Sequence, residues 1–164
     1  MQYLGITNKL ASNAVSEDLV QAIIGQVGSA RRQVQNGYAQ RFIVRNKAGR
    51  ICPVKTAHNI WRWLRANITY KKDDPGAQRI FLPSAFTTLK TGDCKSYATF
   101  LAATLSALGI PNGFYFTSYK STTKPSHVYN WIQTPNGKTI PVDGCYSAFG
   151  KMKKPSYIRK IKIQ

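Results

Sequence analysis

Cysteine is scarce in this chain: there are three, Cys52, Cys94 and Cys145. An odd, irregularly spaced set of this kind does not form the disulfide framework of a small secreted domain. Only two histidines accompany the cysteines, and the spacing of these residues is not that of a zinc-binding motif. We therefore expect no disulfide framework, no metal site and no cofactor.

Long apolar runs are also absent. No run approaches the roughly 18 residues that a membrane-spanning helix requires. Residues 1–20 lack the basic start and continuous apolar stretch that are typical of a secretory signal. We expect no transmembrane segment and a cytoplasmic or virion-associated protein, although the mature form of an exported chain would look the same.

Acidic side chains are the third shortage. Six Asp and Glu residues stand against 24 Lys and Arg residues, which gives a formal net charge of +18. Such a surface attracts nucleic acid and other polyanions at low salt, and these are candidate partners. A basic surface without a dedicated ligand explains the charge equally well, because net charge governs association and not fold.

The remaining composition indicates a globular domain with a core, since 43% of the 164 residues are hydrophobic and 12% are aromatic. Apolar spacing predicts a helix over residues 16–34, with Ser16 as its cap. Alternating segments at 42–45 and 50–54, joined by a turn, predict a hairpin. Thr56 could cap a second helix that runs to about Asn67, and Asp73-Asp74-Pro75-Gly76 is a loop signal.

The clearest element follows a segment, 73–90, that we expect to be largely irregular. Asp93 is a good N-cap and Gly109 a good residue to follow a helix, so a helix is predicted over residues 94–108. Three strands are predicted after it, at 113–120, 127–134 and 138–143. Residues 151–164 are expected to form a basic tail. Helices followed by an antiparallel sheet predict an α+β fold.

Cys94 is the first candidate for chemistry. It opens the predicted helix on the apolar face that it shares with Tyr97 and Leu101, so it is expected to point into the protein. Free backbone N–H groups and the positive end of the helix dipole favour a thiolate at this position. The same N–H groups could stabilise an oxyanion on an attacked carbonyl. An inert buried cysteine is the structural alternative.

His127 and Asp143 are the second and third candidates. A neutral imidazole at His127 could take the proton of a thiol and later return it to a leaving amine. Asp143 ends an apolar strand, where a carboxylate needs a partner, and His127 would be one. The alternatives are a structural histidine and an aspartate that merely begins a turn before Gly144. His58, in the middle of a helix, fits the structural interpretation.

The connection between the two predicted strands offers a geometric test. His127 and Asp143 share a face of adjacent antiparallel strands only if the loop has an odd number of residues. A three-residue loop at 135–137 would pair Tyr129 with Asp143 and His127 with Cys145, and would place Asp143 diagonal to His127. A two-residue Asn-Gly turn, the stronger hairpin signal, would put the two side chains on opposite faces.

Three short motifs, taken in order, resemble the core of transglutaminase-like proteins. They are Gly92-Asp93-Cys94 before an apolar helix, then His127-Val128-Tyr129-Asn130-Trp131, and then Pro141-Val142-Asp143. The resemblance implies a papain-like core in which a catalytic cysteine on a helix packs on an antiparallel sheet. It implies Cys94 as the nucleophile, His127 as the base and Asp143 as the orienting residue. The motifs do not identify a second hydrogen-bond donor for the oxyanion. Three aromatic residues that precede Cys94 in the chain are candidates for it: Trp61, Trp63 and Tyr70.

The resemblance divides the chain into an N-terminal helix and hairpin extension at 1–55, a catalytic core at 56–150 and a basic tail at 151–164. We expect a cysteine enzyme that acts on a protein or peptide amide through a thioester. Hydrolysis by a cysteine protease or amidase is favoured over cross-linking, because a small domain has little material for an amine site. A nucleic-acid- or virion-associated binding protein on the same scaffold is the alternative, and a cell-wall peptide hydrolase is a third possibility.

Overall fold

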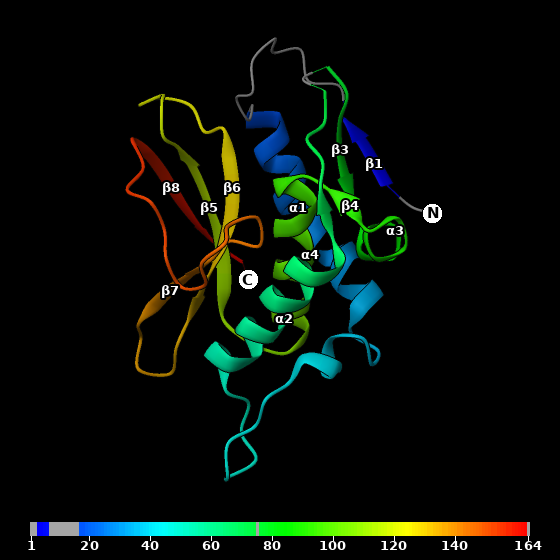
Figure 1. The fold of residues 1–164 in the computed structure, drawn as a ribbon, viewed down its shortest axis with the longest axis vertical. Coiled ribbons are helices and arrows are strands. Elements are labelled where there is room, and N and C mark those ends of the chain that lie inside the picture. Colours follow the sequence, from blue (N-terminus) through cyan, green and yellow to red (C-terminus); the bar gives the residue numbers. More distant parts are fainter. Residues whose placement is uncertain (1–2, 7–16, 75, 164) are drawn as a thin grey trace.

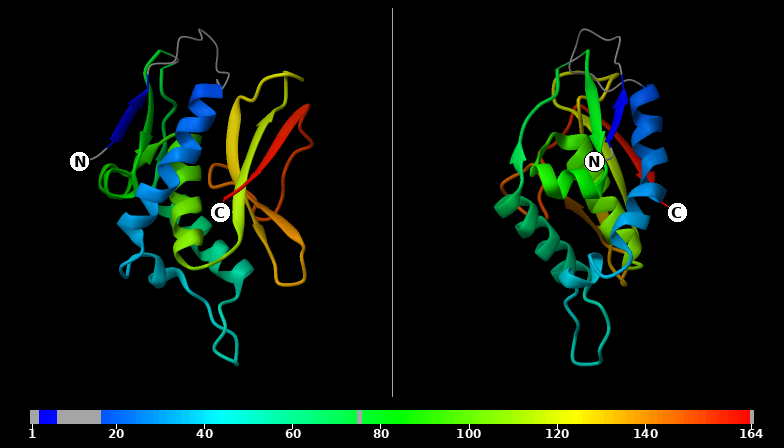
Figure 2. Two further views of the ribbon diagram at one scale, coloured as in Figure 1. Left: turned by 180° about the vertical axis from the view of Figure 1, so that it is seen from behind. Right: turned by 90° about the vertical axis from the view of Figure 1, so that its right-hand side faces the viewer.

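A computed structural model describes residues 3–6, 17–74 and 76–163, and it has an α+β architecture, as the sequence predicts. The helices are α1 (Glu17–Val34), the 3-10 helix η1 (Ala39–Phe42), α2 (Pro53–Asn67), α3 (Pro83–Leu89) and α4 (Cys94–Ala107). The strands are β1 (Tyr3–Ile6), β2 (Thr69–Tyr70), β3 (Gln78–Phe81), β4 (Thr91–Gly92), β5 (Asn112–Ser118), β6 (His127–Gln133), β7 (Thr139–Val142) and β8 (Tyr157–Lys162). In the views of Figures 1 and 2, these helices lie on one face of the main sheet.

The main sheet has four strands in the order β7-β6-β5-β8, and every neighbouring pair is antiparallel. Its central strands are the most buried: all seven residues of β5 are buried, as are the five inner residues of β6. Two smaller pairs complete the strand structure: β1 with β3, antiparallel, and β2 with β4, parallel. The parallel pair joins the end of α2 to the start of α4, which places Tyr70 beside Gly92.

Helix α4 is the centre of the molecule. It packs on the main sheet and also contacts α1, α3 and β3, so residues 94–105 are buried on every side of the helix (Figure 1). Two of its buried hydroxyls have partners inside: Ser96 Oγ accepts from the Phe81 N–H at 2.9 Å, and Thr104 Oγ1 donates to the Phe100 carbonyl at 2.8 Å. The predicted ends are confirmed, because the Asp93 side chain caps the helix and Gly109 adopts a φ of 70°.

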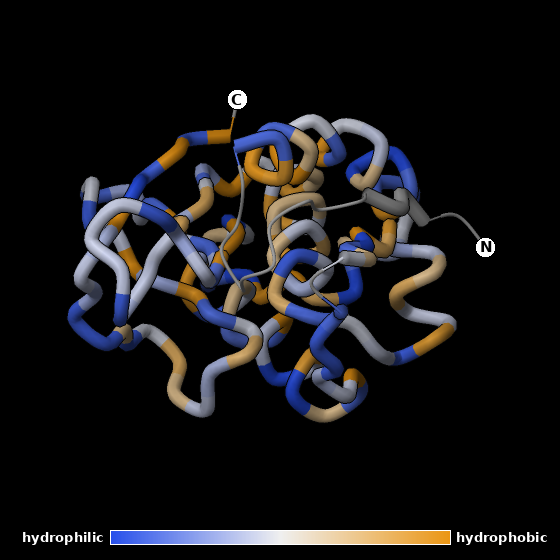
Figure 3. Tube along the Cα trace, turned by 90° about the horizontal axis from the view of Figure 1, so that it is seen from above, coloured by the Kyte–Doolittle hydropathy of each residue, from blue (hydrophilic) through white to orange (hydrophobic). Residues whose placement is uncertain are grey.

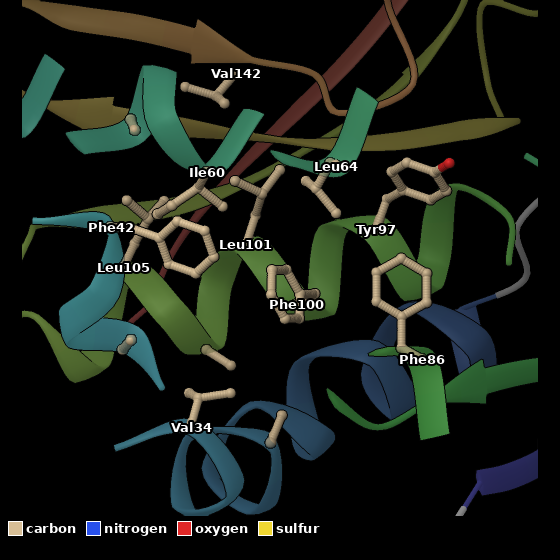
Figure 4. Packing of buried hydrophobic residues seen from close by; sticks show 14 of the residues in the cluster. Val34, Phe42, Ile60, Leu64, Phe86, Tyr97, Phe100, Leu101, Leu105 and Val142 are labelled. Atoms are coloured by element: carbon tan, nitrogen blue, oxygen red, sulfur yellow. The ribbon is translucent and has the colours of Figure 1, made fainter. Parts of the chain in front are cut away.

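The larger core cluster fills the space between α4, α2 and α3 (Figure 4). Phe100 stacks on Trp63 with ring centroids 5.4 Å apart, while Phe86 packs against both Phe100 and Tyr97. Aromatic pairs of this geometry add to the stabilisation from area burial alone. In Figure 3, hydrophobic colours mark much of the central helix, and hydrophilic colours mark many of the peripheral loops.

The predicted hairpin and second helix are correct only in outline. The chain does reverse direction, with Arg45 bridging to Ile51, but η1 ends at Phe42 and α2 already begins at Pro53. Proline at the first helical position has a φ suited to the helix and loses no hydrogen bond there. Thr56 is therefore inside α2 and not its cap; its Oγ1 instead accepts from the Val44 N–H at 3.0 Å.

The expectation of irregular structure over 73–90 is wrong. Strand β3 and helix α3 lie within this segment, and Pro83 begins α3 in the same way that a proline begins α2. The partner of β3 is β1, near the other end of the chain, so its strand character depends on a distant pairing. Two details of the sequence predictions, the Ser16 cap and Pro75 in the loop signal, lie outside the described residues.

The basic tail expected at 151–164 does not lie wholly beyond the core, because part of it is a strand of the main sheet. Within residues 151–164, β8 pairs with β5 along its whole length, from Gly113 opposite Lys162 to Ser118 opposite Tyr157. Exposure alternates along β8, and Ile161 packs against the core. The basic residues of this segment thus belong in part to an edge strand, and lysine on an edge strand discourages pairing with other chains.

Candidate functional site

Cys94 occupies the first position of α4 and is 7% exposed. Asp93 organises the turn around it: its Oδ1 accepts from the Lys95 N–H at 3.1 Å, and its carbonyl accepts from the Ser96 and Tyr97 N–H groups. Within the described part of the chain, no hydrogen bond engages the Cys94 N–H. The first turn therefore presents a thiol and a free backbone donor together.

His127 and Asp143 meet at the other side of the site. His127 is the first residue of β6, and Asp143 follows the last residue of β7. The Nε2 atom of His127 lies 2.7 Å from Oδ2 of Asp143. The other carboxylate oxygen, Oδ1, accepts from the Cys145 N–H at 2.9 Å, and the Asp143 carbonyl accepts from Trp61 Nε1 at 3.0 Å. The side-chain carboxylate and the backbone carbonyl of Asp143 are thus both held by hydrogen bonds.

The register predicted for these strands is confirmed. Gln133 pairs with Thr139 and Asn130 with Val142, which is the register of a three-residue loop. Gly137 adopts a φ of 82°, so it has the left-handed conformation that this loop requires. Asn130, on the opposite face of β6 from His127, donates from Nδ2 to the Ala98 carbonyl of α4 at 3.0 Å. This contact ties the strand to the helix that carries Cys94.

Charge and hydrogen bonding strongly affect the His127 ring. Burial, the largest single influence, lowers its pKa, but hydrogen bonds to the side chains of Asp143 and Cys94 and the negative charges near them act in the opposite direction. The balance raises the pKa of His127 to about 10. The ring is therefore protonated at neutral pH, and it contacts both of the other candidate residues.

Cys145 lies close to this arrangement, whereas Cys52 precedes α2 and is remote from it. Burial is the main cause that raises the pKa of the Cys145 thiol well above its usual value, and the charge of Asp143 adds to the effect. Cys145 is consequently a neutral thiol over the physiological range. All three cysteines are free.

Of the three aromatic candidates for oxyanion stabilisation, two are engaged in other contacts and one is not buried in the core. Trp61 already donates its Nε1–H to the carbonyls of Asp143 and Tyr146, and Trp63 is packed against Phe100 in the core. Tyr70 is 47% exposed, and the charges of Cys94, Asp93 and Asp143 all act on its hydroxyl. Burial is the first cause that raises the pKa of Tyr70, so this hydroxyl remains a proton donor.

A buried ionic cluster beside Cys94 was not foreseen. The Lys95 side chain is 3% exposed and forms an ion pair with Asp93, while its Nζ lies 3.7 Å from Asp73 Oδ2 and 2.6 Å from Gln78 Oε1. Asp73 in turn pairs with Arg79 at 2.9 Å. The sequence did contain a signal for this cluster. A carboxylate next to an apolar helix, such as Asp93, needs a cationic partner if it is buried, and Lys95 is two residues away.

A cavity of about 230 Å³ adjoins His127 and Asp143. Its wall includes Cys145, Tyr129, Lys151 and Lys153, but not Cys94. No local pattern in the sequence indicated this wall, because the 151–153 segment reaches the site only through the fold. In the described ranges, no group of three or more His, Cys, Asp and Glu side chains is placed to bind a metal ion. Nor is any helix there long and apolar enough to cross a membrane.

Comparison with known proteins gives matches in fold at low identity. A proposed cysteine protease from Cytophaga hutchinsonii superimposes with a TM-score of 0.51 and 16% identity, over 98% of this chain and 53% of that one. A proposed protease from Parabacteroides distasonis gives a TM-score of 0.57 and 10% identity, over 87% of this chain and 29% of that one. A structure named as a TGase gives a TM-score of 0.46 and 14% identity, over 85% of this chain and 36% of that one.

This chain thus spans about half or less of the length of those proteins. No curated protein matches its sequence. The family model described as the transglutaminase-like superfamily matches residues 37–144, which is more than half of the chain and includes Cys94, His127 and Asp143. The chain therefore belongs to the transglutaminase-like superfamily.

Proposed function

We propose that this chain is a cysteine enzyme that cleaves an amide bond through a thioester, with Cys94 as nucleophile, His127 as acid and base, and Asp143 as the orienting carboxylate. One observation carries the proposal. The His127 ring lies 2.7 Å from Asp143, and the side chain of Cys94, at the N-terminus of α4, is near enough to help raise the pKa of that ring. A nucleophile next to a base that a third group orients is the pattern of nucleophilic catalysis.

The first half of the reaction forms the thioester. The Cys94 thiolate, beside the protonated His127 ring, attacks the amide carbon, and the carbonyl oxygen becomes an oxyanion. The free N–H of Cys94 donates a hydrogen bond to that oxyanion, and in this proposal the Tyr70 hydroxyl donates a second. The carbon–nitrogen bond then breaks, and His127 gives its proton to the departing amine. The acyl group remains on Sγ of Cys94.

The second half returns the enzyme to its starting state. His127, now neutral, takes a proton from water, and the resulting hydroxide attacks the thioester carbon. Collapse of this second tetrahedral intermediate releases a carboxylic acid and restores the thiolate next to the protonated ring. Asp143 holds the ring through Nε2 in both halves, and its own position is held by the Cys145 N–H and Trp61. Hydrolysis needs no further residue, and it is the outcome that we propose.

Activation of a single thiol tests the proposal. Intact protein is labelled with iodoacetamide across the pH range, and the modified cysteine is identified by mass spectrometry. We expect labelling at Cys94 near neutral pH, and much slower labelling at Cys52 and Cys145. Cys145→Ser should retain the fast reaction, while Cys94→Ala should lose it. Equal rates at all three cysteines would overturn the proposal, and full peptide cleavage by Cys94→Ser would move the nucleophile to Cys145.

The alternative of a nucleic-acid- or virion-associated binding protein rests on the net charge of +18. The segment that would have served as a flexible basic arm contains β8, a paired strand of the sheet. Charge alone indicates attraction to polyanions and not a particular partner. We therefore do not propose a second function.

A further inference from the structure

The cavity beside His127 has an unusual position with respect to the three candidate residues. His127 and Asp143 line it, whereas Cys94 does not. The cavity therefore adjoins the ring that would protonate the leaving amine, and it does not extend to the nucleophile itself. In the proposed reaction the leaving amine receives its proton from His127, so the departing half of the substrate is the half that lies next to this ring.

Two lysines, Lys151 and Lys153, stand at the wall of the cavity on either side of Met152. The segment that carries them is anchored. Tyr129, a buried residue of β6, donates its hydroxyl to Met152 Sδ at 3.7 Å. Before it, the Phe149 ring packs on that of His58 at 4.8 Å.

After the lysines, the Ser156 N–H donates to the Ser118 carbonyl at 2.8 Å. These contacts hold the chain before, between and after the two lysines, so the backbone that carries them is kept beside the cavity by the fold.

The positive charge at this wall is not neutralised within the chain. All six acidic residues are described: Asp73, Asp93 and Asp143 are buried and paired, and Glu17 is paired with Arg159. The last two, Asp18 and Asp74, are exposed and line no part of the cavity. Asp143 does line it, but its Oδ2 is bonded to the protonated His127 ring. The cavity thus has an excess of positive charge.

Resting on the function proposed above, we propose that this cavity is the leaving-group subsite and that it takes a peptide segment with an acidic side chain close to the cleaved amide. Lys151 and Lys153 bind the carboxylate, and the tyrosine and methionine side chains of the wall contact the rest of the segment. Two ammonium groups at one carboxylate provide charge-assisted hydrogen bonds, which are stronger than neutral ones.

The same charge explains why water should be the acceptor. In a transfer reaction, the attacking amine must enter where the first amine left. A lysine side chain or another cationic amine would meet Lys151, Lys153 and the charged His127 ring there, and like charges repel. Water meets no such barrier. The subsite therefore selects against cross-linking to lysine and in favour of hydrolysis.

A binding experiment tests the subsite without turnover. The full chain carrying Cys94→Ala is titrated at low ionic strength with the tripeptide amides Glu-Glu-Gly, Gln-Gln-Gly and Lys-Lys-Gly. We expect Glu-Glu-Gly to bind at least about tenfold more tightly than its uncharged counterpart, and Lys-Lys-Gly to bind least. Adding Lys151→Glu and Lys153→Glu should remove or reverse this preference. The control pair Lys47→Glu and Lys154→Glu makes the same change in net charge away from the cavity and should preserve it.

Equal binding of the acidic and neutral peptides, or equal loss in the control pair, would overturn the subsite. A second measurement digests a peptide mixture with wild-type protein, and mass spectrometry identifies the residues after the cleaved bond. Cleavage without enrichment of acids there overturns the subsite and leaves the proposed enzyme intact. Acid-selective binding, together with no cleavage and an unreactive Cys94, overturns the enzyme and leaves only the cavity's preference for acidic peptides.

Discussion

His127 Nε2 and Asp143 Oδ2 lie 2.7 Å apart because one glycine in a three-residue loop sets the register of two strands. With Gly137 in the left-handed conformation, the side chain of Asp143 comes to the same face as that of His127. A register shift of one residue would turn Asp143 to the opposite face. The contact between these two residues is thus a direct consequence of the turn.

Removing the imidazole should abolish efficient turnover while the fold survives. For His127→Ala we expect kcat/KM for amide cleavage to fall by about 10²–10⁴, the usual contribution of a general acid–base group. Asp143→Asn should lower it by a similar or smaller factor. His58→Ala is the comparison variant: His58 packs on Trp61 and Phe149 and does not contact Asp143, so its loss should lower kcat/KM much less. Wild-type activity in His127→Ala would show that the ring has no role in proton transfer.

The raised pKa of His127 predicts a specific pH dependence. The ring titrates near 10 in the folded protein and near 6.5 when unfolded. A raised folded-state pKa gives stability that is complete below about pH 6.5 and is lost as the pH rises towards 10. The free energy of unfolding should therefore decline across that interval.

Chemical denaturation at several pH values measures this decline, and NMR of the histidine ring reports its titration directly. In Asp143→Asn the ring loses its charged partner, so its pKa should fall and the decline should be smaller. A ring that titrates near 6.5 in the wild-type protein would contradict the structure of the site.

The buried Lys95 should contribute to stability through the acids around it. Lys95→Met leaves Asp93 and Asp73 without their shared cation, which costs about 3–5 kcal/mol in comparable buried pairs. Burial already raises the pKa of Asp93 against the influence of Lys95, so the loss should shift it further upward. Urea unfolding measures the effect, with the exposed Lys55→Met as control.

A second substitution distinguishes charge from shape at this cluster. Asn also caps helices well, so adding Asp93→Asn to Lys95→Met should restore part of the lost stability by removing one unpaired carboxylate. If the double variant is less stable than Lys95→Met alone, the ion pair is not the source of the effect.

In the C-terminal segment that contains β8, the effect of packing on stability can be separated from the effect of charge on polyanion binding. Ile161→Ala keeps the charge but removes contacts with the core, and it should lower the free energy of unfolding by about 2 kcal/mol. Replacing Lys154 and Lys162 with Gln should lower the salt concentration that elutes the protein from heparin, because fewer counterions are released. Each change should leave the other property almost unaltered. Unchanged unfolding in Ile161→Ala would show that the segment is a dispensable arm.

The sequence alone determined those features that depend on neighbouring residues. Asp93 and Gly109 set the ends of α4 because capping acts within one turn of a helix. The loop before β7 limited the register to two choices, because turn conformation acts over a few residues, and the structure has the three-residue loop. Local signals therefore placed a cysteine at a helix start, but they left open whether His127 and Asp143 share a face.

Only the tertiary structure decided the features that depend on distant pairing. Strands β3 and β8 exist because β1 and β5 lie beside them, and neither segment has a local signal strong enough to reveal this. The contact between Cys94 and His127 needs α4 to pack on β6, and the charged cavity wall needs residues 151–153 to cross the sheet. Such contacts join segments far apart in the chain, and a strand or a charged loop acquires its role only when its partner is in place.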